Sequence, residues 1–246
     1  MPNGILHVFT TPYNRGRIVQ CGERIDMEVE GATFATWHPR ALLSGYSWDA
    51  MSAAALLHPG GAPRDILLLG LAGGTMVRSL RRLCPEARIS AVEIDGDLTR
   101  LAVDYMHLDA RAIRLHHGDA YTFLRRTRRK FDVVLDDVYL SGADDVYRPE
   151  SGRDLSELYP RVLRPDGVVA VNLITDGPHR RVLQRLRAGL SAGFAQQTVI
   201  TPPHGYNQAF VAGAALGDAA GVRDKANVFS EQADRALWRA LRVEPV

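Results

Sequence analysis

The sequence has few cysteines, little net charge and no long apolar run, and each shortage removes a class of protein. Its 246 residues include only two cysteines, Cys21 and Cys84, too few for a disulfide scaffold or a cysteine-ligated metal site. Thirty basic and 28 acidic residues leave a net charge of +2, so charge alone indicates neither a nucleic-acid nor a membrane partner. No apolar run approaches the ~18 residues of a membrane-spanning helix, and the N-terminus lacks a secretory pattern, which favours a cytoplasmic protein.

Most of the sequence alternates between apolar strands and helical stretches. Residues 66–69 are all apolar, which is typical of a strand that is buried on both faces of a parallel sheet. The other expected strands of this sheet are 88–94, 112–115, 131–136, 168–173, 195–201 and 208–212. No helix separates the last two strands, so they are expected to form an antiparallel hairpin. We therefore predict an α/β fold whose doubly wound, mostly parallel sheet has seven strands and an antiparallel C-terminal hairpin.

The first 45 residues have a different pattern. Short strand-like segments that are separated by glycine turns predict a small N-terminal antiparallel β-unit. We expect this unit to occupy residues 1–45 and a Rossmann-like nucleoside-binding domain to occupy residues 46–246. A last helix over about 230–241 has apolar residues on one face and is expected to dock on the larger domain.

A glycine turn follows the buried strand 66–69. Gly70, Gly73 and Gly74 lie between this strand and the next helix, where glycines let backbone N–H groups approach a ligand. Glu93 ends the following strand, about 20 residues further on, where a carboxylate can bind both hydroxyls of a ribose. Together, the turn and the acid predict a site for a nucleoside.

Acidic residues also end the third and fourth strands. Asp119, followed by Ala120, comes after the third strand, and Asp136 and Asp137 end the fourth. Because open α/β sheets bind ligands at the carboxyl ends of their strands, we expect a nucleoside-bearing cofactor there. The absence of GxGxxG and P-loop motifs disfavours NAD and ATP, and the absence of metal-ligand spacing predicts no metal. The basic segment 125–130 precedes a strand, so it is expected at the opposite edge and indicates no nucleic-acid partner.

In these motifs and their order, the chain resembles the spermidine synthase-like proteins of the S-adenosylmethionine-dependent methyltransferase fold. The segments that carry the resemblance are YSWDAM (46–51), SAVEID (90–95), FDVVLDD (131–137) and LRPDGV (163–168). The resemblance implies a transferase that uses S-adenosylmethionine or its decarboxylated form and acts on a small-molecule acceptor. It also implies a homodimer that is formed through the N-terminal β-unit.

The resemblance further implies roles for individual residues. Asp137 corresponds to the family's catalytic carboxylate, which orients and deprotonates an attacking amine. Glu93 is expected to bind the ribose, and Asp119 with Ala120 the adenine. The complete set of expected cofactor-binding residues is Gly70, Gly73, Gly74, Glu93, Asp119, Ala120 and Asp136.

A long loop, 138–152, follows the expected catalytic carboxylate. Long loops at the ligand edge of a sheet often become lids. Its tyrosines, Tyr139 and Tyr147, are expected to wall the acceptor pocket, and we count Tyr139 among the catalytic residues. The acids Asp144 and Asp145 lie on the same loop.

The chain departs from the family pattern at two acidic positions. Gly73 stands where the family's GGGDGG turn has the aspartate that holds the aminopropyl amine, and Leu140 stands where its DxxD motif has the second acid. Each lost charged contact costs on the order of 2 kcal/mol. We therefore favour methyl transfer from S-adenosylmethionine to a small nucleophile, an amine, with Asp137 as base. A true aminopropyltransferase that uses the decarboxylated cofactor and a non-catalytic nucleoside-binding homologue remain as alternatives.

Overall fold

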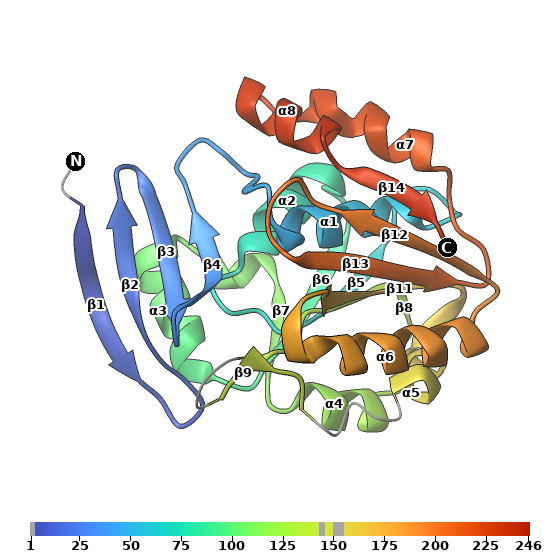
Figure 1. The fold of residues 1–246 in the computed structure, drawn as a ribbon, viewed down its shortest axis with the longest axis horizontal. Helices are drawn as coiled ribbons and strands as arrows, with labels where there is room; N and C mark the ends of the chain where they lie inside the picture. Colours follow the sequence, from blue (N-terminus) through green and yellow to red (C-terminus); the bar gives the residue numbers. More distant parts are fainter. Residues whose placement is uncertain (1–2, 143–145, 150–154) are drawn as a thin grey trace.

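The N-terminal part of the chain forms a four-stranded antiparallel sheet. The computed structural model describes residues 3–142, 146–149 and 155–246. Figure 1 shows this small sheet beside the larger α/β part of the molecule. Its strands, in the spatial order β1-β2-β3-β4, are β1 (Gly4–Thr10), β2 (Arg15–Cys21), β3 (Arg24–Val29) and β4 (Ala32–Trp37). The antiparallel β-unit expected from the glycine turns is therefore present, while the domain division after residue 45 remains a prediction.

The larger sheet has eight strands in the order β14-β12-β13-β11-β8-β5-β6-β7. Strands β11, β8, β5, β6 and β7 run parallel, and β13, β12 and β14 continue the sheet in antiparallel fashion. The bounds are β5 (Asp65–Leu69), β6 (Arg88–Glu93), β7 (Arg114–His117), β8 (Phe131–Asp136), β11 (Leu163–Ile174), β12 (Gln196–Thr201), β13 (Asn207–Gly213) and β14 (Arg242–Pro245). The α/β fold with its mostly parallel sheet and antiparallel C-terminal hairpin is confirmed.

One strand of this sheet was not expected from the sequence. β14 follows the last helix and pairs with β12, so that the sheet has eight strands where seven were predicted. Val243 provides the physical reason, because it pairs with Ile200 and both side chains are buried in the apolar core. Four residues with a single buried side chain are too short a pattern to indicate a strand by periodicity.

Helices cover both faces of the larger sheet (Figure 1). In β5, Ile66 and Leu68 belong to the core beneath α1, α2, α7 and α8, whereas Leu67 and Leu69 face α4, α5 and α6. This alternation follows from the two-residue period of a strand and explains why the run is apolar throughout. The helices are α1 (Ser47–Ala54), α2 (Thr75–Leu83), α3 (Gly96–Met106), α4 (Ala120–Arg126), α5 (Leu155–Val162), α6 (Arg180–Gly193), α7 (Ala219–Asp224) and α8 (Gln232–Arg239). Among the described segments, no helix has the length and apolarity that crossing a membrane requires.

The small sheet packs against helix α3. Met27 of β3 shares an apolar cluster with Leu98 and Met106 of α3. Asp95 caps this helix by accepting hydrogen bonds from backbone N–H groups of its first turn. The Asp95 carboxylate also accepts a hydrogen bond from the Asn14 amide at 2.7 Å, so one residue fixes both the helix and the loop between β1 and β2.

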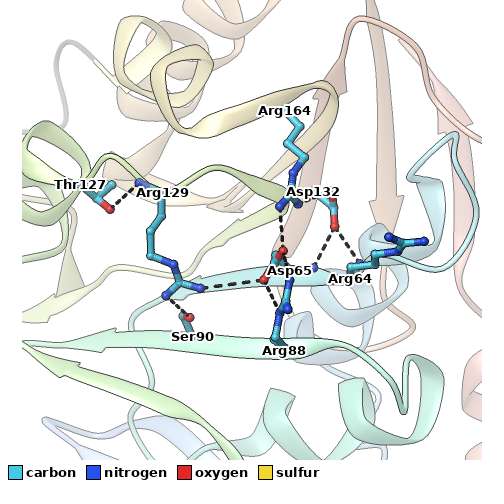
Figure 2. Close-up of polar contacts among 8 residues, drawn as sticks. All are labelled: Arg64, Asp65, Arg88, Ser90, Thr127, Arg129, Asp132 and Arg164. Atoms are coloured by element: carbon cyan, nitrogen blue, oxygen red, sulfur yellow. Dashed lines mark hydrogen bonds and ion pairs between the residues drawn. The ribbon is translucent and has the colours of Figure 1, made fainter.

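A network of arginines and aspartates holds the amino ends of the parallel strands (Figure 2). Asp65 of β5 accepts hydrogen bonds from Arg88 and Arg164, and Asp132 of β8 accepts one from Arg164. Arg129, from the basic segment 125–130, donates a hydrogen bond to Ser90 in the same network. The basic segment therefore contributes to strand packing at this edge.

Candidate active site

A pocket of about 430 Å³ opens at the carboxyl ends of the parallel strands. It is bordered by the turn after β5, the ends of β6 and β8, the start of α1, strand β4 and the turn before β13. The predicted site residues that line it are Gly70, Glu93, Asp119, Ala120, Asp137 and Tyr139. The structure thus brings six of the nine predicted residues together, since strands that run parallel have their carboxyl ends at the same edge of the sheet.

Gly70 allows the ends of β5 and β8 to meet. Its φ of +81° lies in the left-handed region, and a Cβ atom at this position would lie 2.6 Å from the carbonyl oxygen of Asp137. The backbone N–H of Asp137 in turn donates a hydrogen bond to the Leu69 carbonyl at 2.9 Å. Only glycine combines this conformation with this close approach. The glycine turn therefore sets the distance between the end of β5 and Asp137.

The carboxylate of Glu93 is held by backbone amides. Its Oε2 accepts hydrogen bonds from the N–H groups of Leu71 and Ala72, both at 2.9 Å, and its Oε1 accepts one from Asp95 at 2.9 Å. A carboxylate has about four acceptor positions, so Oε1 retains capacity for a further donor. Because Glu93 is nearly buried and lines the pocket, that donor can be a ligand hydroxyl.

Asp119 and Ala120 stand at the start of helix α4. Asp119 is the N-cap, and its Oδ1 accepts a hydrogen bond from the N–H of Thr122 at 2.7 Å. Ala120 is the first residue of the helix, and both residues line the pocket. The cap fixes the carboxylate beside the helix N-terminus, where backbone N–H groups also face outward.

Asp137 lies half-buried in the pocket wall. Its Oδ1 accepts a hydrogen bond from the Asn172 amide nitrogen at 2.6 Å. Burial raises the pKa of Asp137 to about 6, although the Asn172 hydrogen bond and the nearby Arg148 guanidinium act in the opposite direction. A carboxylate with a pKa near neutrality can accept a proton from a substrate and release it again.

Gly73 and Gly74 do not line the pocket, contrary to the prediction that they contact the cofactor. A Cβ atom at Gly73 would lie 2.4 Å from both the Ala35 Cβ and the Met106 sulfur, and one at Gly74 would lie 2.6 Å from Leu108. These glycines are needed because the turn packs against β4 and the end of α3. The same contacts leave no room for an acidic side chain at position 73 without rearrangement.

Asp136 also lies outside the pocket lining, which corrects its assignment to the cofactor site. It is fully buried, forms an ion pair with Arg148 and accepts a hydrogen bond from the Tyr159 hydroxyl at 2.5 Å. Successive residues of a strand point to opposite faces, so Asp136 at the end of β8 points toward α4 and α5. Its neighbour Asp137 is the acid that lines the pocket.

Tyr139 lines the pocket, but its hydroxyl is engaged by the main chain of β11. The hydroxyl donates a hydrogen bond to the Asn172 carbonyl at 3.0 Å and accepts one from the N–H of Ile174 at 3.3 Å. Arg148 stacks over its ring, with 5.1 Å between the guanidinium carbon and the ring centre. These contacts fit a residue that walls the pocket better than one that donates a proton.

The loop after Asp137 is only partly described. Two short strands, β9 (Leu140–Ser141) and β10 (Val146–Tyr147), pair with each other, and Leu140 and Val146 line the pocket. Tyr147 is exposed and does not line it. The acids Asp144 and Asp145 lie outside the described residues, and the expectation that this loop acts as a lid stays a prediction.

Sequence reasoning assigned no role to several residues that build the site. Asn172 interrupts the apolar pattern of β11, and a buried amide in such a strand is a signal that could have identified it. Tyr206, in the turn before β13, and Asn207, the first residue of β13, also line the pocket. Their position depends on the antiparallel hairpin and has no local sequence signature. Arg148 is buried behind the pocket, although an arginine in a loop normally indicates a solvated position.

Comparisons with known proteins identify relatives of this arrangement. The family model for the spermine/spermidine synthase domain matches residues 44–199. A polyamine aminopropyltransferase of Pyrobaculum aerophilum is 26% identical over 81% of this chain and 70% of its own length. A probable polyamine aminopropyl transferase of Bifidobacterium longum is 30% identical over 60% of this chain, but the match spans only about a third of that relative, 32%. The crystal structure of a probable spermidine synthase from Corynebacterium glutamicum has the same fold, with a TM-score of 0.76 at 18% identity, over 98% of this chain and 91% of that one.

Proposed function

The chain belongs to the spermine/spermidine synthase family, and from this premise we propose that it transfers an aminopropyl group from decarboxylated S-adenosylmethionine to a small-molecule amine. The methyl transfer favoured by the sequence is thereby replaced as the leading hypothesis. The finding against it is that the relatives matched over 60% and 81% of this chain are named polyamine aminopropyl transferases, whereas relatives named eEF1A lysine and N-terminal methyltransferase homologues match only 30% of it.

The charge of the pocket is the observation that best supports this proposal. Glu93, Asp119 and Asp137 line it, and the described lining residues include no lysine, arginine or histidine. Decarboxylated S-adenosylmethionine carries a sulfonium and an ammonium group and has no carboxylate, so it complements such a pocket. The carboxylate of S-adenosylmethionine itself would face acidic groups, and no cationic side chain among the described lining residues would balance it.

Asp137 is the proposed base. An amine is protonated near neutral pH, and it must lose that proton before its nitrogen can attack carbon. The Asp137 carboxylate can orient the amine, accept its proton and return the proton to water. The bound sulfonium donor supplies an activated carbon: the amine nitrogen bonds to this carbon while the carbon–sulfur bond breaks and its electron pair stays on sulfur. The products are an aminopropylated amine and neutral 5′-methylthioadenosine.

Methyl transfer from S-adenosylmethionine remains a second candidate because of positions 73 and 140. Gly73 has no room for the acid that would hold the donor's amine, and Leu140 presents an apolar side chain to the pocket. Both features weaken the charge complementarity of the pocket to the amine of the decarboxylated donor and to the amines of a polyamine acceptor. A non-catalytic nucleoside-binding protein is the third candidate.

The product formed from each donor distinguishes these candidates. The purified protein would be incubated with decarboxylated S-adenosylmethionine or S-adenosylmethionine and a panel of amines, and the products separated by mass spectrometry. We expect 5′-methylthioadenosine from the decarboxylated donor, and turnover lowered by about 10²-fold or more in an Asp137→Asn variant. Formation of S-adenosylhomocysteine from S-adenosylmethionine, with no product from the decarboxylated donor, would support methyl transfer. Binding of 5′-methylthioadenosine in calorimetry, lost in Glu93→Ala, with no turnover of either donor would support the non-catalytic candidate.

A further inference from the structure

A side chain on the C-terminal hairpin, Asn207, donates a hydrogen bond to Asn172, the residue that binds Asp137. Asn207 begins β13, the antiparallel strand beside β11, and it lines the pocket. We propose that Asn207 is a positioning residue that acts on Asp137 through the amide of Asn172. This inference rests on the proposed function in one respect, the role of Asp137 as base.

The two amides and the carboxylate form a chain of hydrogen bonds. The Asn207 amide nitrogen donates to the Asn172 side-chain oxygen at 3.0 Å, and the Asn172 amide nitrogen donates to Asp137 Oδ1 at 2.6 Å. The main chain at Asn172 is fixed as well, because its carbonyl accepts hydrogen bonds from both the Tyr139 hydroxyl and Arg148. With its backbone held and its side chain buried, Asn172 can change only the direction of its amide.

Asn207 makes one of these two directions strongly preferred. An asparagine amide presents two donors on one side and an acceptor on the other. If Asn172 turned its amide around, its nitrogen would face the nitrogen of Asn207 and its oxygen would face the carboxylate of Asp137. The hydrogen bond to Asp137 would be lost and replaced by a contact between like groups, and the one to Asn207 would survive only if the Asn207 amide turned as well. The donor on Asn207 therefore favours the direction in which the Asn172 nitrogen faces Asp137.

This arrangement has a consequence for proton transfer. The hydrogen bond from Asn172 stabilises the charged form of Asp137 against the cost of burial, and it occupies Oδ1. The second oxygen, Oδ2, then remains for the proton of the acceptor amine. Asn207 thus helps to set the pH above which Asp137 is a carboxylate. It also helps to determine which oxygen of Asp137 accepts the proton of the amine.

Substitution of Asn207 by its isosteric acid tests the proposal. In Asn207→Asp, the new carboxylate demands a donor, so Asn172 is expected to turn its nitrogen toward position 207 and its oxygen toward Asp137. The acid limb of kcat/KM against pH should then move up by about one pH unit. Gln208→Glu is the matched control, because it adds the same charge one residue away. Gln208 bonds to Thr201 on β12 and does not line the pocket, and the limb should stay in place.

A double-mutant cycle separates amide orientation from direct repulsion between carboxylates. In an Asn172→Ala background the connecting amide is missing, so Asn207→Asp should no longer move the acid limb. An equal shift in both backgrounds would overturn the proposal. Asn207→Ser removes the amide without adding charge, and it should give a smaller upward shift. Thermal melting of each variant shows whether the fold is retained.

A measurement that does not depend on turnover keeps this inference distinct from the proposed function. The pKa of Asp137 would be followed by 13C NMR of aspartate-labelled protein with 5′-methylthioadenosine present, and its signal assigned by Asp137→Asn. A higher pKa in Asn207→Asp than in the wild type and Gln208→Glu is expected, even if no acceptor amine is found. An unchanged pKa in Asn207→Asp would overturn the inference, whether or not the enzyme transfers an aminopropyl group.

Discussion

At the scale of single residues, two adjacent acids at the end of β8 have opposite roles. Asp136 is buried in an ion pair with Arg148, whereas Asp137 lines the pocket and bonds to Asn172. The sequence predicted that acids gather at this edge, but it could not say which of the two faces the ligand. A shift of one residue in a strand exchanges the faces, and that register is set by long-range pairing with β5 and β11.

The first prediction concerns the proton acceptor itself. Burial raises the pKa of Asp137 to about 6, so the group is a carboxylate above that pH and is protonated below it. Activity should therefore fall as the pH drops through about 6, because a protonated Asp137 cannot accept a further proton. Asp137→Asn should lower kcat by about 10²-fold or more at neutral pH. Its affinity for 5′-methylthioadenosine in calorimetry should match that of the wild type. Undiminished turnover in this variant would remove Asp137 as the base.

At the scale of elements, the carboxyl ends of β5, β6 and β8 were predictable as the site, but the elements that complete it were not. Strand–helix alternation requires the strand ends to share one edge, and this placed Gly70, Glu93 and Asp137 together. Asn207 arrives from an antiparallel strand, whose start meets the same edge only because the hairpin reverses direction. Thr33 and Phe34 reach the pocket through the packing of β4 on the glycine turn. No local sequence pattern predicts such tertiary contacts.

The second prediction concerns the segment β10 and the arginine that follows it. Arg148 is buried and bonds to Asp136, Asn172 and Tyr121, while its neighbours Val146 and Pro149 line the pocket. Arg148→Met leaves the charge of Asp136 buried without its cationic partner, which should lower the free energy of unfolding by about 3–5 kcal/mol. It should also raise KM, because the pocket wall is no longer anchored.

The combined variant Arg148→Met with Asp136→Leu provides the control. Replacing both members of a buried ion pair by apolar side chains is often neutral for stability, so this protein should regain most of its unfolding free energy in urea titration. If the single variant unfolds at the same urea concentration as the wild type, the ion pair does not anchor the loop.

The third prediction concerns the arginine–aspartate network at the amino ends of the strands (Figure 2). Hydrogen bonds from Arg88 and Arg164 lower the pKa of Asp65 to about 2, against burial. A carboxylate whose pKa is lower in the folded than in the unfolded state contributes stability above about pH 4, and that contribution is lost as the pH falls toward 2. Asp65→Asn should lower the free energy of unfolding at pH 7. The loss should be only about 1–2 kcal/mol, because solvent screens the partly exposed arginines that pair with Asp65. The difference should shrink in melts near pH 2.

At the scale of the whole molecule, the sequence predicted the order and type of most elements and left their interfaces open. The apolar run of β5 and the regular alternation after it determine a parallel sheet, because such strands must be covered by helices on both faces. The eighth strand β14 and the packing of the small sheet on α3 depend on contacts between distant segments, and these appear only when the chain is folded.

The last prediction concerns the free edge of the small sheet. β1 pairs only with β2 among the described strands, and three of its apolar side chains, Ile5, Leu6 and Val8, are exposed. An edge strand with exposed apolar side chains readily pairs with another chain, so we predict that a second copy covers β1 and that the protein is a homodimer. Light scattering on a sizing column should give twice the mass of one chain. Val8→Lys should shift the protein to monomer, because the lysine ammonium would be buried in the interface without a partner. Val246→Lys, at the exposed C-terminus, should leave the dimer intact. A wild-type protein that elutes as a monomer at high concentration would contradict this assembly.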